Sequence, residues 1–456
     1  MICQFAWANV FSFKEQATLN LVAASQIHND TELDKGNVFR ARERPQLDLL
    51  RVAAIYGANA SGKSNVWRAL GVFQRCVLES ANVGFSLNLL PFYLDTVSAS
   101  KPSYFEIIFV QNETRGDVAC EIQYRYGFEI QTRDGQTVIH AEWLYEAEST
   151  TEATLFEREG SSVRLGRRFK EGKVLLKDKQ LSRTDALFLS LTAQLGTPHA
   201  SALVSSLRAN IRMIGGIDDD ALLAFTANCL EKDKHCDAIQ TLMREADTGI
   251  PRVVLEDVDD TDQDVVFPDG VSEEEQEQLR RSIRNRVRAR TRLMAEHPVY
   301  DENGNQVDTV RFPLTLLESQ GTQKLFAYAG PILDALANGR CLVIDEMDAR
   351  FHPLLTRALI RLFQSPETNP KNAQLVFITH DTNLLDSKNL RRDQILFVEK
   401  DRFGASHLYA LSDFKGVRKG ASFEDQYIQG RYGGIPFLGG LSKAFADAQG
   451  EAVAIS

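Results

Sequence analysis

Apolar and polar positions alternate along this chain with periods that change from region to region, and these changes predict its elements. The continuous apolar run at residues 49–56 has the length of a buried strand, and the spacing in residues 65–70 predicts a helix close behind it. Residues 105–110, 119–130 and 138–145 are strand-forming stretches separated by turns. They predict an antiparallel meander inserted after the first helix.

The pattern changes again beyond this meander. Residues 184–246 have largely helical spacing, and an acidic, turn-rich stretch at residues 256–262 leads into a strongly charged helix predicted for residues 272–295. Strands and helices alternate over residues 311–409, which is typical of a parallel sheet covered by helices. The expected fold class is α/β, with the meander and a helical segment inserted into it.

The length of 456 residues is enough for two or three structural units. We expect a first lobe at residues 1–150 that contains the meander. A helical insertion at residues 151–310 would act as a lid or partner region, and residues 311–456 would form a second lobe.

Composition and charge exclude several classes of protein. The hydrophobic content of 43% and the charged content of 25% are ordinary for a globular protein. No apolar run is long enough to span a bilayer, so no membrane partner is expected. The six cysteines contain no Cys-x-x-Cys pair, which fits reduced thiols in a cytoplasmic protein. With a net charge of −10, a contact with nucleic acid would need a local basic patch.

A glycine-rich segment at residues 57–64 follows the first buried strand. Two glycines at this spacing let successive backbone N–H groups point inward at a polyphosphate, with Lys63 as the cation and the Ser64 hydroxyl as a ligand of Mg²⁺. The helix that follows would place its N-terminus at the phosphates. The residues expected to bind the nucleotide here are Gly57, Asn59, Ser61, Gly62, Lys63, Ser64 and Asn65.

An apolar strand at residues 341–344 ends in two carboxylates, Asp345 and Glu346. In a parallel sheet its carboxyl end would lie beside the phosphate loop, where Asp345 could hold Mg²⁺ through water. Glu346 would face another direction and could act as general base toward water. The alternative is a strand that simply ends in solvated acids, but the phosphate loop upstream favours the metal site.

Two shorter motifs lie on either side of this strand in the sequence. Ser319 and Gly321 form a Ser-x-Gly at the start of a predicted helix, where a hydroxyl and free N–H groups make an anion site. Downstream, the apolar strand at residues 375–378 leads to His380, which could contact a terminal phosphate. Each motif alone is weak, since a histidine at a strand end is more often structural. Their order along the chain carries the information.

This order resembles the ATP-binding-cassette (ABC) ATPases, and within them the soluble branch related to chromosome-maintenance (SMC) and RecF/RecN-type proteins. The motifs are closer still to the prokaryotic AAA15 abortive-infection ATPases, which include OLD-like and RloA-like proteins and the AriA subunit of the PARIS defence system. The matching stretches are residues 9–13, 55–65, 318–322, 344–348, 351–353, 379–381 and 430–436. Between about residues 150 and 310 the resemblance is loose.

The resemblance implies a site shared by two subunits. Lys63 and Ser64 would serve the ATP bound in their own subunit, whereas Ser319 and Gly321 would reach the γ-phosphate held by a second copy. The active unit would therefore be a head-to-tail dimer with two sandwiched ATP molecules.

Three more positions receive roles from the resemblance. Asp348 would occupy the loop that crosses the subunit interface, and His380 the position of the γ-phosphate switch. A lid glutamine near the metal should precede the helical insertion. Gln194 is the best candidate, although no spacing fixes it.

An activity and a biological role follow from the same resemblance. We expect Mg²⁺-dependent hydrolysis of ATP, with Glu346, His380 and Lys63 as catalytic residues. The expected role is that of a nucleotide-gated sensor or scaffold in an antiphage system. Its toxic effector, such as a nuclease, would be another polypeptide, since residues after His380 show no carboxylate cluster suited to two metals. The alternative is a DNA-binding ATPase of repair or chromosome maintenance.

Two weaker signals leave alternatives open. Seven arginines lie within residues 280–292 and could grip DNA or RNA phosphates or an acidic partner, but glutamates just before them could equally neutralise a solvated helix. Cys229, His235 and Cys236 could suggest zinc, but no fourth ligand lies nearby.

Overall fold

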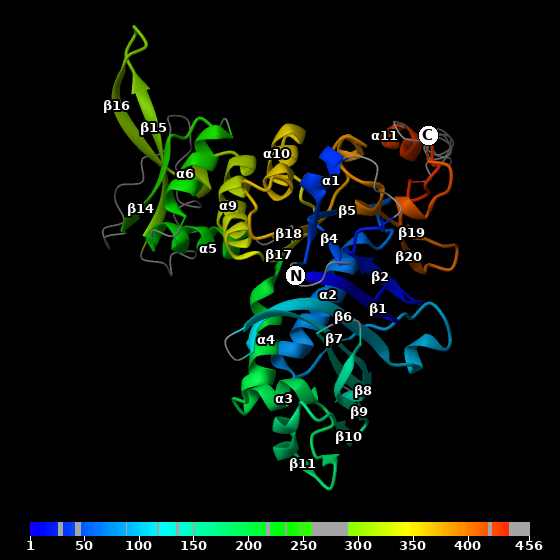
Figure 1. Cartoon of the computed structure of the whole chain (residues 1–456). Helices are drawn as coiled ribbons and strands as arrows, with labels where there is room; N and C mark the ends of the chain where they lie inside the picture. Colours follow the sequence, from blue (N-terminus) through cyan, green and yellow to red (C-terminus); the bar gives the residue numbers. More distant parts are fainter. Residues whose placement is uncertain are drawn as a thin grey trace, which may run out of the picture. The chain divides into compact units, whose positions relative to one another are not determined.

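The chain forms two compact units. A computed structural model describes residues 1–25, 31–41, 47–87, 89–115, 118–133, 136–148, 151–215, 219–232, 235–246, 248–257, 291–417 and 422–436. Unit 1 comprises Met1–Gly215, Asn338–Asp348 and Thr356–Ser456, and unit 2 comprises Gly216–Ala337 and Ala349–Leu355. Figure 1 follows the chain through its elements by colour.

A largely parallel sheet lies at the centre of unit 1. Its strand order is β13 (Ile211–Ile214), β17 (Cys341–Ile344), β18 (Gln374–Ile378), β5 (Val52–Tyr56), β19 (Ile395–Lys400) and β20 (Ser406–Ala410). Neighbouring strands are parallel except β19 and β20, which are antiparallel. Every residue of β5, β17 and β18 is buried, as their mostly apolar sequences predict. The carboxyl ends of these three strands therefore meet at one edge.

A second, antiparallel sheet also belongs to unit 1. Its strand order is β11 (Leu176–Lys177), β12 (Gln180–Leu181), β10 (Ser162–Leu165), β9 (Ala153–Glu159), β8 (Gln136–Ala147), β7 (Val118–Arg133), β6 (Ser103–Arg115), β1 (Ile2–Ala8) and β2 (Ala17–Asn20). The predicted meander corresponds to β6, β7 and β8 and is confirmed. The sheet is larger than predicted, because β1 and β2 join it from before the phosphate loop and β9 to β12 extend it past residue 150.

Helix α2 (Lys63–Glu79) fills the space between the two sheets. On this helix, the ring of Phe73 stacks on Phe128 of β7 with 5.5 Å between centroids. The same ring meets Phe5 of β1 edge-on, with 5.6 Å between centroids. The buried positions recur every three to four residues, so one helical face is apolar. The core of unit 1 joins this face to apolar side chains of both sheets. The expected α/β fold with an inserted antiparallel sheet is confirmed.

Unit 2 combines helices with a small antiparallel sheet. Its elements are α5 (Asp219–Glu231), α6 (Cys236–Glu245), β14 (Arg252–Asp257), β15 (Thr291–Tyr300), β16 (Gln306–Pro313), α8 (Leu314–Leu317) and α9 (Gln320–Asn338). Helices α5 and α9 approach closely at Gly330, where a Cβ atom would lie 2.6 Å from Thr226 Oγ1. The Thr226 hydroxyl donates to the Ala327 carbonyl oxygen (3.0 Å) and accepts from the Gly330 N–H (3.1 Å).

The remaining elements of unit 1 lie around its sheets. They are α1 (Thr31–Asn37), β3 (Val38–Arg40), β4 (Asp48–Leu50), α3 (Phe188–Gln194), α4 (Pro198–Asn210), α10 (Pro353–Gln364), which starts at the unit boundary, and α11 (Phe423–Ile428).

One sequence-based prediction on the secondary structure needs correction. The charged helix predicted for residues 272–295 is wrong at its end, because residues 291–295 begin strand β15. Pairing with β14 and β16 decides the conformation there, which local helical spacing could not show. The segment 184–246 is largely helical, as predicted, and the short strand β13 lies within it. The arginines at residues 280–290 lie outside the described residues.

Candidate functional site

The phosphate-binding loop joins β5 to α2 at the carboxyl edge of the parallel sheet. Gly57 (φ 155°) and Gly62 (φ 109°) have backbone angles that favour glycine. A Cβ atom at Gly57 would lie 2.3 Å from the carbonyl oxygen of Val398, and one at Gly62 would lie 2.3 Å from Oγ of Ser406. The loop therefore packs so closely on β19 and β20 that neither position has room for a larger residue. Asn59 lies exposed at its tip.

Lys63 is buried and turned back toward its own loop. Its Nζ atom donates to the carbonyl oxygens of Gly57 (2.9 Å) and Ala58 (2.8 Å). Burial lowers the pKa of Lys63 to about 8. Nearby carboxylates oppose this pKa shift, and they belong to Asp345, Asp348 and Glu346. The predicted cation of the loop thus lies among the predicted acids.

Asp345 directly follows β17 and lies beside the phosphate loop. Its backbone N–H donates to the Ile214 carbonyl oxygen at 2.9 Å. Burial raises the pKa of the Asp345 carboxyl group, and a hydrogen bond from Ser64 opposes that rise. The Oδ1 atom is buried without a hydrogen-bond partner. A hydroxyl and a carboxylate oxygen with spare capacity are donors that Mg²⁺ prefers, so Ser64 and Asp345 fit this ion.

Glu346 has a left-handed backbone (φ 54°) and an exposed side chain. The next residue, Met347, is fully buried, and its N–H donates to the Ile378 carbonyl oxygen at 3.1 Å. This bond to β18 fixes the turn that presents the Glu346 carboxylate at the edge of the sheet, where it can reach solvent water.

His380 follows β18 and lies beside Asp348. The His380 backbone N–H donates to Oδ2 of Asp348 at 3.3 Å. Burial of the ring and the positive charge of Lys63 lower the pKa of His380 below 6.5. The imidazole is therefore neutral at pH 7 and can donate one hydrogen bond.

Buried polar atoms without a hydrogen-bond partner gather around this loop. Within the described part of the chain they include Ser61 Oγ, Tyr56 Oη, Asp345 Oδ1, Asp348 Oδ1 and Asp381 Oδ2. Folded proteins leave few such atoms, and each needs a physical explanation. A bound polar group that supplies the missing partners explains why several occur together.

Two serines that were not among the predicted binding residues support the phosphate loop. Ser406 Oγ, on β20, lies 2.6 Å from the Ser61 carbonyl oxygen and 2.7 Å from Ser12 Oγ. Ser12 Oγ also accepts from the Asn65 amide at 2.8 Å. The segment 9–13 matched the family motifs, but a single serine in a strand such as Ser406 carries no sequence signal.

The glycine-rich stretch at residues 430–436 also lies against the loop. A Cβ atom at Gly434 would lie 3.5 Å from the Cα atom of Gly57. The Tyr427 hydroxyl donates to the Gly434 carbonyl oxygen at 2.9 Å, and its ring stacks on Phe397 with 5.3 Å between centroids. The matching motif near the end of the described chain is thus part of the support of the phosphate loop.

Ser319 and Gly321 belong to unit 2. Ser319 is exposed at the start of α9, where its Oγ atom accepts from the Thr322 N–H at 3.2 Å. A Cβ atom at Gly321 would lie 2.8 Å from the Arg350 carbonyl oxygen, and Lys324 Nζ donates to the Ala349 carbonyl oxygen at 2.7 Å. The residues after Asp348 therefore pack on the first turns of α9.

The structure does not bring Gln194 to this site. Gln194 ends α3 with an exposed side chain. Helix α3 contacts the far end of α2, since Ser190 Oγ donates to the Val77 carbonyl oxygen at 2.7 Å. At about 1.5 Å of rise per residue, Val77 lies roughly 20 Å along α2 from Lys63. The strand beside Asp345 is β13, which the sequence did not predict.

Among the described residues, no group of three or more His, Cys, Asp and Glu side chains could hold a metal ion, and this includes Cys229, His235 and Cys236. The six cysteines form no disulfides. In the described part of the chain, no helix combines the length and apolar character that a membrane span needs.

Residues 52–386 match the model of a family described as "AAA domain, putative AbiEii toxin, Type IV TA system", so the match includes the phosphate loop, Asp345 and His380. The chain belongs to this AAA-domain family. Among solved structures, it is similar to the SMC head domain from Thermotoga maritima, with 14% sequence identity and a TM-score of 0.37, over 90% of this chain and 98% of that one. No functionally curated protein matches the sequence of this AAA-domain protein.

Proposed function

We propose that this AAA-domain protein is a Mg²⁺-dependent ATPase of the ABC type that closes as a head-to-tail dimer around ATP. The cluster of buried, unpartnered polar atoms around the phosphate loop carries this proposal. The oxygens of a polyphosphate can accept from the hydroxyl groups among these atoms, a metal ion and its bound water can be partners of the carboxylate oxygens, and Lys63 lies among them.

Each candidate site residue of unit 1 has a distinct part in this chemistry. Ser64 and Asp345 would hold Mg²⁺, which neutralises charge on the phosphates. Lys63 exchanges its backbone carbonyl partners for phosphate oxygens. Glu346 accepts the proton of the attacking water, and the neutral His380 donates a hydrogen bond to the terminal phosphate.

The second copy would supply Ser319 and Gly321. Ser319 is exposed, and the free N–H groups at the start of the long helix α9 favour an anion. Gly321 leaves room for the Arg350 carbonyl oxygen. In the closed dimer this end of α9 would contact the γ-phosphate bound to its partner.

We further propose a role in the cytoplasm as a nucleotide-gated sensor or scaffold of an antiphage system of the AAA15 abortive-infection type. Support comes from the sequence motifs that resemble those of the AAA15 ATPases and from a family description that refers to a toxin of a toxin–antitoxin system. The toxic effector would be a separate polypeptide, which the ATP-closed form holds until infection.

The variant Glu346→Gln tests this role, since it should bind ATP without hydrolysing it. With ATP present, it should retain a co-expressed effector through affinity purification and bind double-stranded DNA weakly. Lys63→Met is the matched control and should lose the effector. Strong DNA binding with a steep salt dependence, without a protein partner, would instead favour the alternative of a repair or chromosome-associated ATPase.

A further inference from the structure

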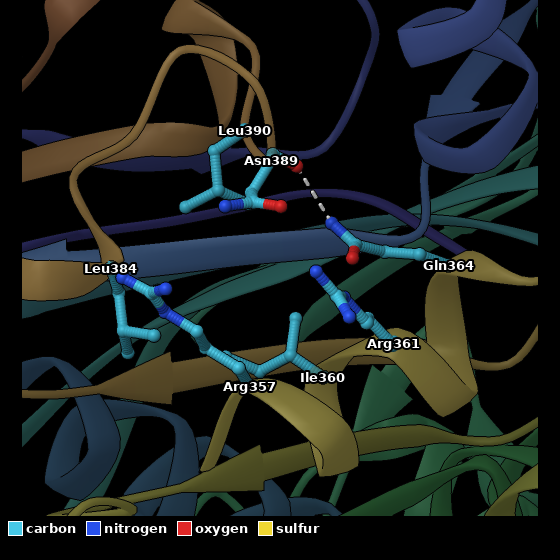
Figure 2. A pocket seen from close by; sticks show the side chains of 7 residues that line it. All are labelled: Arg357, Ile360, Arg361, Gln364, Leu384, Asn389 and Leu390. Atoms are coloured by element: carbon cyan, nitrogen blue, oxygen red, sulfur yellow. Dashed lines mark hydrogen bonds between the residues drawn. The ribbon is translucent and has the colours of Figure 1, made fainter. Parts of the chain in front are cut away.

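A small hollow in unit 1 lies between helix α10 and the segment that follows His380 (Figure 2). Its volume is about 20 Å³, which is room for about one water-sized group. Ile360, Leu384 and Leu390 form apolar walls, while Arg357 and Arg361 reach toward the hollow from α10.

The two arginines share one face of α10, because residues four apart on a helix are neighbours. Within the described residues, no carboxylate lies within ion-pair distance of either guanidinium. Asp386, in the facing segment, has its own partners: its oxygens accept from the Lys388 N–H and the Asn389 amide, both at 2.9 Å. Asp386 therefore does not neutralise the positive charge at this hollow.

Each arginine has donors to spare. Arg357 donates from Nη2 to the Asn383 carbonyl oxygen, which holds its side chain in place, but its Nε atom is buried without a partner. Arg361 is exposed and makes no hydrogen bond in the described structure. A guanidinium with free N–H groups beside a pocket is the donor arrangement that planar oxyanions match.

We propose that this hollow binds the carboxylate of an Asp or Glu side chain presented by a partner protein. A carboxylate is smaller than a tetrahedral phosphate, and one of its oxygens occupies about the space of a single water-sized group. The walls formed by Ile360, Leu384 and Leu390 suit the methylene groups of an acidic side chain. This site is separate from the residues proposed to bind ATP, and its test does not depend on hydrolysis.

Fluorescence anisotropy with a labelled hexaglutamate peptide and the full chain tests the proposal at low salt. Arg361→Gln and Arg357→Gln should each weaken peptide binding about fivefold or more, as expected for the loss of a charge-assisted hydrogen bond. Arg361→Lys keeps the charge but not the planar fork, and its affinity should lie between those of the wild type and Arg361→Gln.

Arg75→Gln is the matched control, because Arg75 is an exposed helical arginine that already pairs with Glu79 at 3.0 Å. It should change peptide affinity less than twofold, and ATP hydrolysis should be unaffected in Arg361→Gln. The proposal is overturned if the wild type does not bind the peptide or if Arg361→Gln binds it equally well. It is also overturned if inorganic phosphate or a single-stranded oligonucleotide displaces the peptide at lower concentration than glutarate does, since the site would then be one for phosphate.

Discussion

The backbone N–H of His380 donates to Oδ2 of Asp348 at 3.3 Å. This bond joins the residue expected to sense the γ-phosphate to the loop expected to cross the dimer interface. The residue after Asp348 is Ala349, whose carbonyl oxygen accepts from Lys324 of helix α9, the helix that begins at the Ser-x-Gly motif.

Removing the Asp348 carboxylate should separate ATP binding from turnover. We expect Asp348→Ala to lower kcat about tenfold, the effect of losing one or two hydrogen bonds in the transition state, with ATP affinity changed less than threefold. Steady-state hydrolysis and binding of a fluorescent ATP analogue measure the two quantities. Unchanged kcat would show that the bond to His380 has no part in hydrolysis.

Lys63→Met should abolish ATP binding without harming the fold. Burial already disfavours the charged form of Lys63, as its lowered pKa shows, so an apolar side chain of similar length should be tolerated. Thermal unfolding should give a melting temperature equal to or above that of the wild type, and the rise that ATP causes in the wild type should disappear. A retained ATP-induced rise would contradict the assignment of Lys63.

Ser406→Ala should weaken ATP affinity about fivefold, because the loop loses a hydrogen bond to the Ser61 carbonyl oxygen and one to Ser12. The control is Ser201→Ala, whose hydroxyl donates to the Ala193 carbonyl oxygen on α3. Calorimetric titration with ATP compares the two variants. Equal affinities would mean that these serines do not hold the loop in its binding conformation.

Glu142→Ala should strongly destabilise the antiparallel sheet. Glu142 is fully buried, and it accepts from the Tyr126 hydroxyl (3.0 Å) and from the N–H groups of Phe188 (2.5 Å) and Leu189 (3.0 Å) beside Arg158. Truncation leaves the buried Arg158 without its counter-ion, which costs about 3–5 kcal/mol.

Denaturant unfolding followed by the fluorescence of the three tryptophans, Trp7, Trp67 and Trp143, measures this loss. Glu148→Ala, which changes a half-exposed glutamate of the same region, is the control and should cost less than about 0.5 kcal/mol. Similar costs for the two variants would contradict a central role for the buried pair.

Local motifs made much of the site predictable from the sequence. The phosphate loop, the Asp345–Glu346 pair and His380 each follow an apolar strand, and parallel strands bring their carboxyl ends to one edge. Strand β13 was not predicted, because its short apolar pattern lies between helices and its partner β17 is distant in the sequence. Gln194 was chosen as the lid glutamine from the resemblance alone, because no spacing along the chain restricts that position. In the structure, Gln194 lies away from the candidate site.

The supports of the loop were also beyond sequence reasoning. Ser406 and Gly434 act through tertiary contacts with Ser61 and Gly57, which no local pattern encodes. The strand β15 replaced the end of a predicted helix because pairing on both sides outweighs local propensity. Motifs thus located the candidate site, whereas long-range packing decided what surrounds it.

Closure of a head-to-tail dimer around ATP is tested by the molar mass of Glu346→Gln in light scattering, with Mg²⁺ and with or without ATP. We expect a monomer without nucleotide and a dimer with ATP, and no dimer when Ser319→Arg is added to the same chain. A mass that does not respond to ATP, or a dimer that survives Ser319→Arg, would contradict the proposed head-to-tail closure.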